Sequence, residues 1–151
     1  MKLQKLISKL EKHHKKKLDL SLGRTLNLLK KLGNPQDKLK NVVTVVGTNA
    51  KASMCYSLKS ILNQAGHKTN LYTSPHLLSY TERYVFDDKE INEEELIELL
   101  TGVEKTLGDD NATLFEILTC AFLKYAENFR DNINIIAVSY THLTLPTILR
   151  V

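Results

Sequence analysis

The sequence lacks most of the features that mark secreted, membrane or metal-rich proteins. Its only two cysteines, Cys55 and Cys120, lack metal-type spacing and fall in segments expected to be helical, which favours buried free thiols over a disulfide or a ligand pair. No apolar run approaches the length of a membrane span, and the first residues, Met-Lys-Leu-Gln-Lys, lead into no apolar signal core. We therefore expect a cytoplasmic protein that has no contact with membranes.

Charge is unevenly distributed along a chain of otherwise ordinary composition. The 151 residues, 42% of them hydrophobic and 25% charged, suffice for one domain with a core. Residues 1–40 hold 12 Lys/Arg against 3 Asp/Glu, a net charge of +9, whereas residues 41–151 carry a net charge of −5. A basic arm can bind nucleic acid, and a steep salt dependence would support that reading. Because apolar residues recur among the lysines at helical spacing, we favour a solvated helix face.

Residues 42–53, Val-Val-Thr-Val-Val-Gly-Thr-Asn-Ala-Lys-Ala-Ser, are the most informative stretch. Five β-branched residues lead directly into Gly47, and helical spacing resumes after Ser53, so a buried strand, a tight loop and a helix are predicted. That arrangement directs backbone N–H groups and the positive end of a helix dipole at one point, where Lys51 and Ser53 can add a charge and a magnesium ligand. The stretch predicts a phosphate-binding loop, and the alternative is an ordinary strand-to-helix turn with a surface lysine.

The loop departs from the usual spacing Gly-x-x-x-x-Gly-Lys-Ser/Thr. Alanine stands on both sides of Lys51, as Ala50 and Ala52. A positive φ at either alanine would be strained by about 1 kcal/mol.

The rest of the chain predicts further elements of an α/β domain. A strand over residues 68–73 would complete a right-handed β-α-β unit, whose ligand site lies at the carboxyl ends of its strands. Thr73-Ser74-Pro75-His76 would then lie beside the loop. Glu116, near the start of a helix, could complete a magnesium shell. The remaining predictions are helices over 2–17, 22–32, 111–129 and from Asn92 onward, and extended segments over 84–86 and 132–136.

Separated stretches resemble the folylpolyglutamate synthase/dihydrofolate synthase family, relatives of the Mur ligases. Order and spacing both fit over residues 20–136. The stretches are Leu32-Gly33-Asn34-Pro35-Gln36, Val46-Gly47-Thr48-Asn49-Ala50-Lys51-Ala52-Ser53, Leu71-Tyr72-Thr73-Ser74-Pro75-His76-Leu77 with Glu82-Arg83, and Phe115-Glu116 with Thr119, Ala121 and Phe122.

The resemblance implies a Mur-ligase-type ATP-binding α/β domain, here a truncated parallel-sheet P-loop domain with N-terminal helices. Family members use Mg-ATP to phosphorylate the terminal carboxylate of dihydropteroate or a folate, which L-glutamate then attacks. Lys51 would be catalytic, and Ser74 and Glu116, with Ser53 as a further candidate, would bind Mg²⁺. Thr73, Pro75 and His76 would lie near the substrate. The ATP phosphates would contact the nucleotide loop, which is formed by Gly47, Thr48, Asn49, Ala50, Lys51, Ala52 and Ser53.

The resemblance also divides the chain. We expect a basic helical segment over residues 1–40, a partial ATP-binding domain over 41–136, and a non-native, sequencing-adapter-derived tail over 137–151. His142 in that tail is therefore not counted as the family's further metal-binding histidine. The chain alone would be inactive and monomeric. The alternative from another class is a non-catalytic nucleotide-binding or regulatory module, consistent with Ala50 and Ala52.

Overall fold

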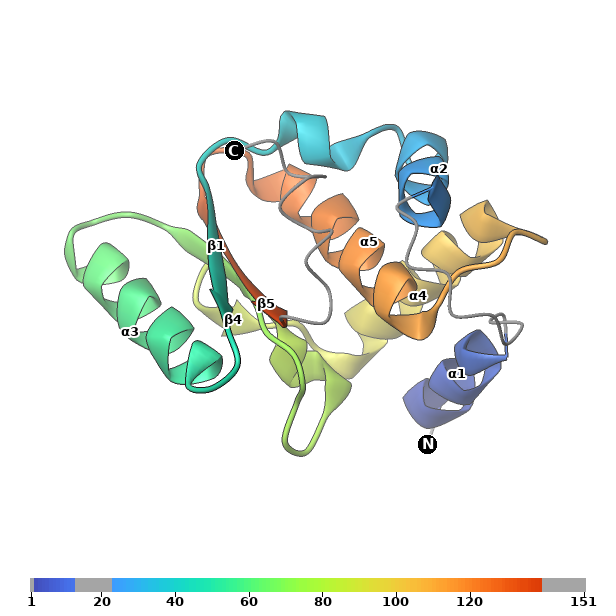
Figure 1. The fold of residues 1–151 in the computed structure, drawn as a ribbon, viewed down its shortest axis with the longest axis horizontal. Helices are drawn as coiled ribbons and strands as arrows, with labels where there is room; N and C mark the ends of the chain where they lie inside the picture. Colours follow the sequence, from blue (N-terminus) through green and yellow to red (C-terminus); the bar gives the residue numbers. More distant parts are fainter. Residues whose placement is uncertain (1, 13–22, 140–151) are drawn as a thin grey trace.

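The computed structural model describes residues 2–12 and 23–139. Figure 1 shows one α/β unit in which helices flank a central sheet. Its elements are α1 (Lys2–Glu11), α2 (Gly23–Lys31), η1 (Pro35–Lys38), β1 (Val42–Gly47), α3 (Lys51–Gln64), β2 (Thr69–Tyr72), η2 (Tyr80–Arg83), β3 (Tyr84–Phe86), β4 (Lys89–Glu90), α4 (Glu93–Leu107), α5 (Leu114–Ala126), η3 (Glu127–Phe129) and β5 (Ile133–Ser139). His13, His14, Lys15, Lys16, Lys17 and His142, with the end of the expected first helix, lie outside the described residues.

The sheet has the strand order β1-β5-β2-β3-β4. β5 runs parallel to both β1 and β2, whereas β3 and β4 pair antiparallel. The expected parallel sheet is therefore confirmed for three strands and extended by two antiparallel ones. The strands of the predicted β-α-β unit are parallel but not adjacent, because the last described strand is inserted between them. That strand also runs to Ser139, beyond the expected Ile136.

Helices cover the two faces of the sheet unequally. α3 packs on one face, where Cys55 forms a small buried cluster with Leu71 and Ile135. On the other face lie α1, α2, α4 and α5, whose apolar sides share a single larger core with the sheet. Figure 1 shows this division, with α3 alone at the left and the other helices to the right. The basic N-terminal helices thus belong to the core of the domain.

Aromatic rings fill the larger core between α5 and the sheet. Phe122 stacks on Tyr72 at 5.0 Å and on Phe86 at 5.3 Å between ring centroids. The Tyr84 hydroxyl donates a hydrogen bond of 2.9 Å to the carbonyl of Leu118 in α5, which satisfies a buried polar group. These contacts hold α5 firmly against the strands that carry the site.

Local sequence signals set the helix ends. Asn92 and Thr113 form capping boxes at the starts of α4 and α5, each with a glutamate three residues later. Gly33 and Gly66, at φ +85° and +87°, follow the ends of α2 and α3. The predicted start of α4 at Asn92 is thus confirmed, whereas α5 begins at Leu114, three residues after the predicted Asn111, because Thr113 supplies its cap.

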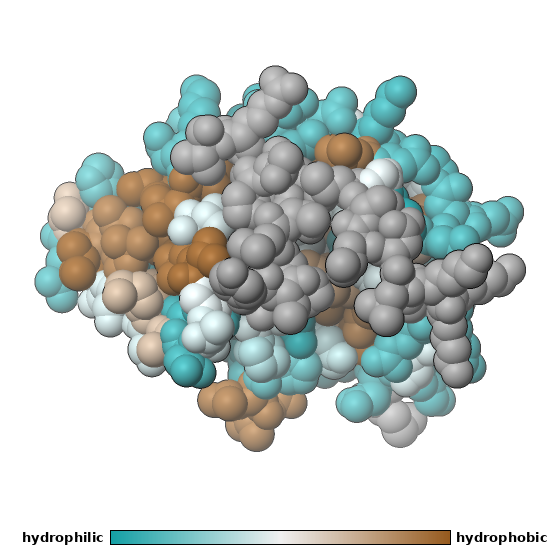
Figure 2. Space-filling view, in the orientation of Figure 1, coloured by the Kyte–Doolittle hydropathy of each residue, from teal (hydrophilic) through white to brown (hydrophobic). Residues whose placement is uncertain are grey.

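The outer surface of α3 and the free edge of β1 are apolar in places. Brown surface gathers in Figure 2 over the region that α3 and β1 occupy in Figure 1. The exposed apolar side chains there are Val43, Val46, Met54, Tyr56 and Ile61. Within the described residues, β1 pairs on one side only, so its other side is an unpaired strand edge.

Three buried asparagines join β2 to β5. The amide of Asn70 donates to Asn134 Oδ1 at 2.9 Å and accepts from the amide of Asn132 at 2.9 Å. Asn134 in turn donates to the carbonyl of Lys40, just before β1. All three side chains are buried, so their hydrogen bonds specify one register for the parallel strands.

Replacing Asn70 with alanine should lower the free energy of unfolding by about 2 to 3 kcal/mol, because two buried partners lose their hydrogen bonds. Urea denaturation measures this. Asn111→Ala, at an exposed asparagine, serves as the control and should change stability by less than about 0.5 kcal/mol. Equal effects of the two substitutions would contradict a structural role for the network.

Candidate nucleotide-binding site

The predicted phosphate loop is the turn between β1 and α3. β1 ends at Gly47 and α3 begins at Lys51, so only Thr48, Asn49 and Ala50 lie between them. The first N–H groups of a helix have no acceptor within the helix, and the dipole of this 14-residue helix places positive potential at the same point. The loop therefore has the backbone geometry of an anion site.

Lys51 lies over the loop rather than pointing into solvent. Its Nζ donates to the carbonyl of Gly47 at 2.7 Å and to that of Thr48 at 3.3 Å. A phosphate oxygen would replace one of these acceptors at little cost, because a charged donor bonds more strongly to an anion than to a neutral carbonyl.

The two alanines beside Lys51 have different conformations. Ala50 is left-handed, at φ 57° and ψ 12°, whereas Ala52 lies in the first turn of α3. The expected strain at a missing glycine therefore falls on Ala50 alone. Of the two alanines beside Lys51, only Ala50 has a backbone conformation that favours glycine.

Cys55 lies one helical turn beyond Lys51 and is buried between α3 and the sheet. Burial raises the pKa of its thiol to about 11, and the positive charge of Lys51 offsets part of this rise. Cys120 is also buried, and burial raises its pKa further. Both are free thiols, as predicted, and both remain protonated at neutral pH.

A second loop follows β2. Like the phosphate loop, it lies where the parallel strands end, and strand β5 lies between β1 and β2, the strands from which the two loops start. Arg83 organises the second loop: Nε donates to His76 Nδ1 at 2.9 Å, and Nη1 donates to Ser74 Oγ at 3.1 Å. The guanidinium also lies 5.1 Å from the centre of the Tyr80 ring. Burial and the charge of Arg83 lower the pKa of His76, so its ring is neutral at pH 7 and can accept this hydrogen bond.

Glu82 holds the tip of this loop. Its carboxylate accepts from the backbone N–H groups of Leu77, Leu78 and Ser79 at 2.8, 2.8 and 2.7 Å. The side chains of Leu77 and Leu78 are consequently almost fully exposed, at 92% and 94%. The carboxylate of Glu82 thus fixes a loop that exposes two leucine side chains. These leucines directly follow His76, which the sequence predicted to lie near the substrate.

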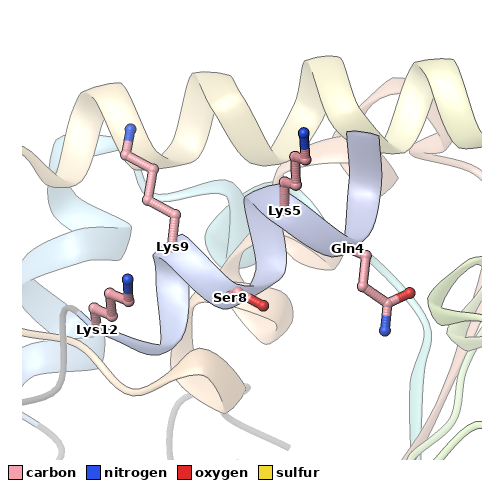
Figure 3. Close-up of a pocket in the computed structure, with 5 residues that line it drawn as sticks. All are labelled: Gln4, Lys5, Ser8, Lys9 and Lys12. Atoms are coloured by element: carbon pink, nitrogen blue, oxygen red, sulfur yellow. The ribbon is translucent and has the colours of Figure 1, made fainter. Parts of the chain in front are cut away.

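Two hollows differ in their relation to these loops. A small one, about 130 Å³, lies between α1 and the second loop and is lined by His76, Ser79 and Tyr80 among others. A shallower one, about 380 Å³, is lined by residues of α1 and by Lys12, which directly follows that helix (Figure 3). Because it contains no residue of either loop, the second hollow is not part of the candidate site.

Glu116 lies in the first turn of α5, the helix whose Phe122 packs on Tyr72 of β2. Thr119, one turn later, has its hydroxyl 3.4 Å from that of Tyr72, the last residue of β2. The Glu116 carboxylate accepts from the Thr113 N–H at 2.6 Å and pairs with the guanidinium of Arg24 at 3.3 Å. It is therefore a helix cap and an ion-pair partner at once.

The oxygen atoms of Ser53, Ser74 and Glu116 fit a magnesium ion in donor chemistry. Ser74 and Glu116 are engaged with arginines instead, and the described residues contain no cluster of three or more His, Cys, Asp or Glu side chains that could hold a metal. A divalent ion would therefore have to share or replace these contacts.

Sequence reasoning did not find Arg24 as a site residue. It lies 92 positions from Glu116, in a segment whose charges are otherwise those of a solvated helix face. A single arginine beside the buried Thr25 carries no local signal of its role, so only the tertiary structure reveals it.

No family model matches the chain, but comparison with known proteins finds relatives of similar sequence and structure. The chain is 38% identical over 117 residues to the dihydrofolate synthase/folylpolyglutamate synthase of Escherichia coli K12, an alignment that covers 78% of this chain and 28% of that protein. It is homologous to dihydrofolate synthase/folylpolyglutamate synthase. The resemblance seen in the sequence is thereby confirmed, for a chain that spans about a third of its relatives' length.

Solved structures of the family have the same fold. Escherichia coli FolC in complex with DHPP and ADP superposes with a TM-score of 0.82 at 35% identity, covering 90% of this chain and 33% of FolC. The bifunctional enzyme from Yersinia pestis, complexed with AMPPNP and a manganese ion, gives a TM-score of 0.83 at 31% identity, covering 91% and 33%. Both structures match nearly the whole of this chain, which spans about a third of their length.

Ala50→Gly should raise the free energy of unfolding by about 0.5 to 1 kcal/mol, since relief of left-handed strain exceeds the added backbone entropy. Ala52→Gly is the matched control within the same loop. It should lower stability by about 1 kcal/mol, because Ala52 is helical. Urea denaturation of both variants distinguishes them, and a loss of stability in both would refute strain at Ala50.

The backbone N–H groups of Leu77 and Ser79 hold the pKa of Glu82 below its ordinary value of 4.5. Order in the loop should be complete above pH 4.5 and be lost as the pH falls through the lower, folded-state pKa. Amide chemical shifts of Leu77, Leu78 and Ser79 during acid titration measure this. Glu82→Gln should abolish the transition, and a midpoint at or above pH 4.5 would contradict the capping role.

Proposed function

We propose that this chain is the ATP-binding part of a folate ligase. The observation that carries the proposal is the meeting of two loops at one edge of the sheet. One bears Lys51 at a helix N-terminus, and the other bears Ser74 and His76 after a parallel strand. The related structures are complexes with ADP and AMPPNP, which supports nucleotide binding at this domain.

Each loop has a distinct task in this proposal. The backbone N–H groups of residues 47–53 bind the ATP phosphates, and Lys51 leaves its carbonyl acceptors to stabilise charge on the transferred phosphoryl group. Thr73, Pro75 and His76 line the approach of the acceptor substrate. Bound at Ser74 and Glu116, with Ser53 as a further ligand, Mg²⁺ would neutralise the phosphate oxygens.

We propose that the whole protein joins L-glutamate to dihydropteroate or a folate after phosphorylating the terminal carboxylate. The dihydrofolate synthase/folylpolyglutamate synthases that match this chain are about three times as long as its aligned part. Residues 1–136 alone would therefore bind nucleotide without completing the reaction. We further propose a cytoplasmic, monomeric protein. Among the described helices, none is long and apolar enough to cross a membrane.

A non-catalytic nucleotide-binding module of the same fold is the second candidate. The left-handed Ala50 favours it, because strain at the loop weakens preorganised binding. Turnover by an intact homologue that carries alanine at both positions beside the lysine would exclude it. Nucleic-acid binding by the first helices is less well supported, since Lys9 of α1 pairs with Glu104 of α4 at 3.0 Å.

ATP should bind this chain in the presence of Mg²⁺, as measured by isothermal titration calorimetry. Lys51→Ala should weaken binding at least about tenfold, because it removes a charged hydrogen bond to phosphate. Lys105→Ala, which removes the same charge from the exposed last turn of α4, should leave binding unchanged. A folded chain that binds ATP equally well without Lys51 would refute the phosphate loop.

A further inference from the structure

We propose that Arg24 and a divalent cation compete for the carboxylate of Glu116, so that binding of the metal-nucleotide complex loosens the first turn of α2 from α5. This inference rests on the proposed function, because it takes Glu116 as a metal ligand. It adds a coupling between the metal site and the N-terminal helices. Arg24 becomes a positioning residue that holds Glu116 until the cation arrives.

The contacts show how closely α2 is tied to this carboxylate. Arg24 donates from Nε to Glu116 Oε2 and from Nη2 to Oε1, each at 3.3 Å. The neighbouring Thr25 hydroxyl donates to Oε1 at 3.3 Å. One carboxylate therefore receives three hydrogen bonds from the first turn of α2, in addition to the one from its own helix.

The two attachments differ in strength. The bond from Thr113 N–H is short, at 2.6 Å, and belongs to the capping box that starts α5. The bonds from Arg24 and Thr25 are long, although the site is well shielded, with 13% of the Glu116 side chain and 19% of the Arg24 side chain exposed. A carboxylate so shielded needs a positive partner. The distances indicate that the hydrogen bond from Thr113 to Glu116 persists, while a cation can replace Arg24 at this carboxylate.

A cation at Glu116 and the guanidinium of Arg24 would lie within a few ångströms of one another. Like charges at that separation repel strongly where water is largely excluded. Both oxygens of Glu116 already accept from Arg24, so a bound ion must replace at least one of these bonds. Because the ion carries two charges and Arg24 one, the ion can replace the guanidinium at this carboxylate.

Thermodynamic linkage makes the coupling reciprocal. Weakening the contact between Arg24 and Glu116 must strengthen metal binding by the same factor by which metal binding weakens the contact. The N-terminal helices would thus respond to occupancy of the nucleotide site through a single carboxylate. Residues 23–25 lie at the start of α2, so the response is confined to its first turn.

Mn²⁺ binding to the full chain without nucleotide, with electron paramagnetic resonance detection of free Mn²⁺, tests the exchange. Arg24→Met should bind Mn²⁺ about tenfold more tightly than the wild type, because the competing positive charge at Glu116 is gone. Lys31→Met is the matched control, since it removes another α2 cation that pairs with Asp110 instead, and its affinity should be unchanged. Arg24→Lys, which cannot form the two-pronged contact, should lie between the two.

Glu116→Gln separates failure of this inference from failure of the proposed metal site. If Glu116→Gln weakens Mn²⁺ binding but Arg24→Met does not strengthen it, the competition is refuted and the metal site stands. If Glu116→Gln has no effect, or no variant binds Mn²⁺, both are refuted.

Hydrogen exchange adds an independent readout. Mn²⁺ with AMPPNP should speed amide hydrogen exchange at residues 24–27 of the wild type. Slower or unchanged exchange there would overturn the coupling.

Discussion

Insertion of β5 between β1 and β2 is the constraint on which the site depends. Among the described residues, β1 has hydrogen-bonded partners in β5 only, along all six of its residues. β5 holds β2 on its other side. The phosphate loop and the loop after β2 therefore take their relative positions from a strand that comes more than 60 residues later. With strands about 4.8 Å apart, the loops start roughly 10 Å from each other.

This arrangement also explains how the strained Ala50 is tolerated. Strand β1 and the 14-residue helix α3 fix both ends of a three-residue loop, so the chain between them has no relaxed alternative. Cys55 and its cluster hold α3 against the sheet from below. The packing free energy of the helix far exceeds about 1 kcal/mol of strain, and the loop geometry survives the loss of glycine.

The sequence predicted what is encoded locally and missed what is not. The helix start at Asn92, the stop at Gly33 and the strand-loop-helix around Lys51 all depend on residues a few positions apart. Adjacency of strands depends on side chains far apart, such as the buried amide network, and periodicity does not encode it. The second loop was placed at the correct edge because parallel strands share that edge, although its organisation by Arg83 and Glu82 was not foreseen.

The charge asymmetry of the chain acquires a structural meaning in the folded domain. Four described cations of residues 1–40 pair with carboxylates of residues 104–127; these pairs are Lys9–Glu104, Arg24–Glu116, Lys31–Asp110 and Lys38–Glu127. A basic segment is thus complementary to the acidic body on which it packs, and its charge need not indicate a nucleic acid. Exposed pairs of this kind contribute little to stability. Arg24–Glu116 is the pair in which both side chains are most shielded, and it is the one that reaches the candidate site.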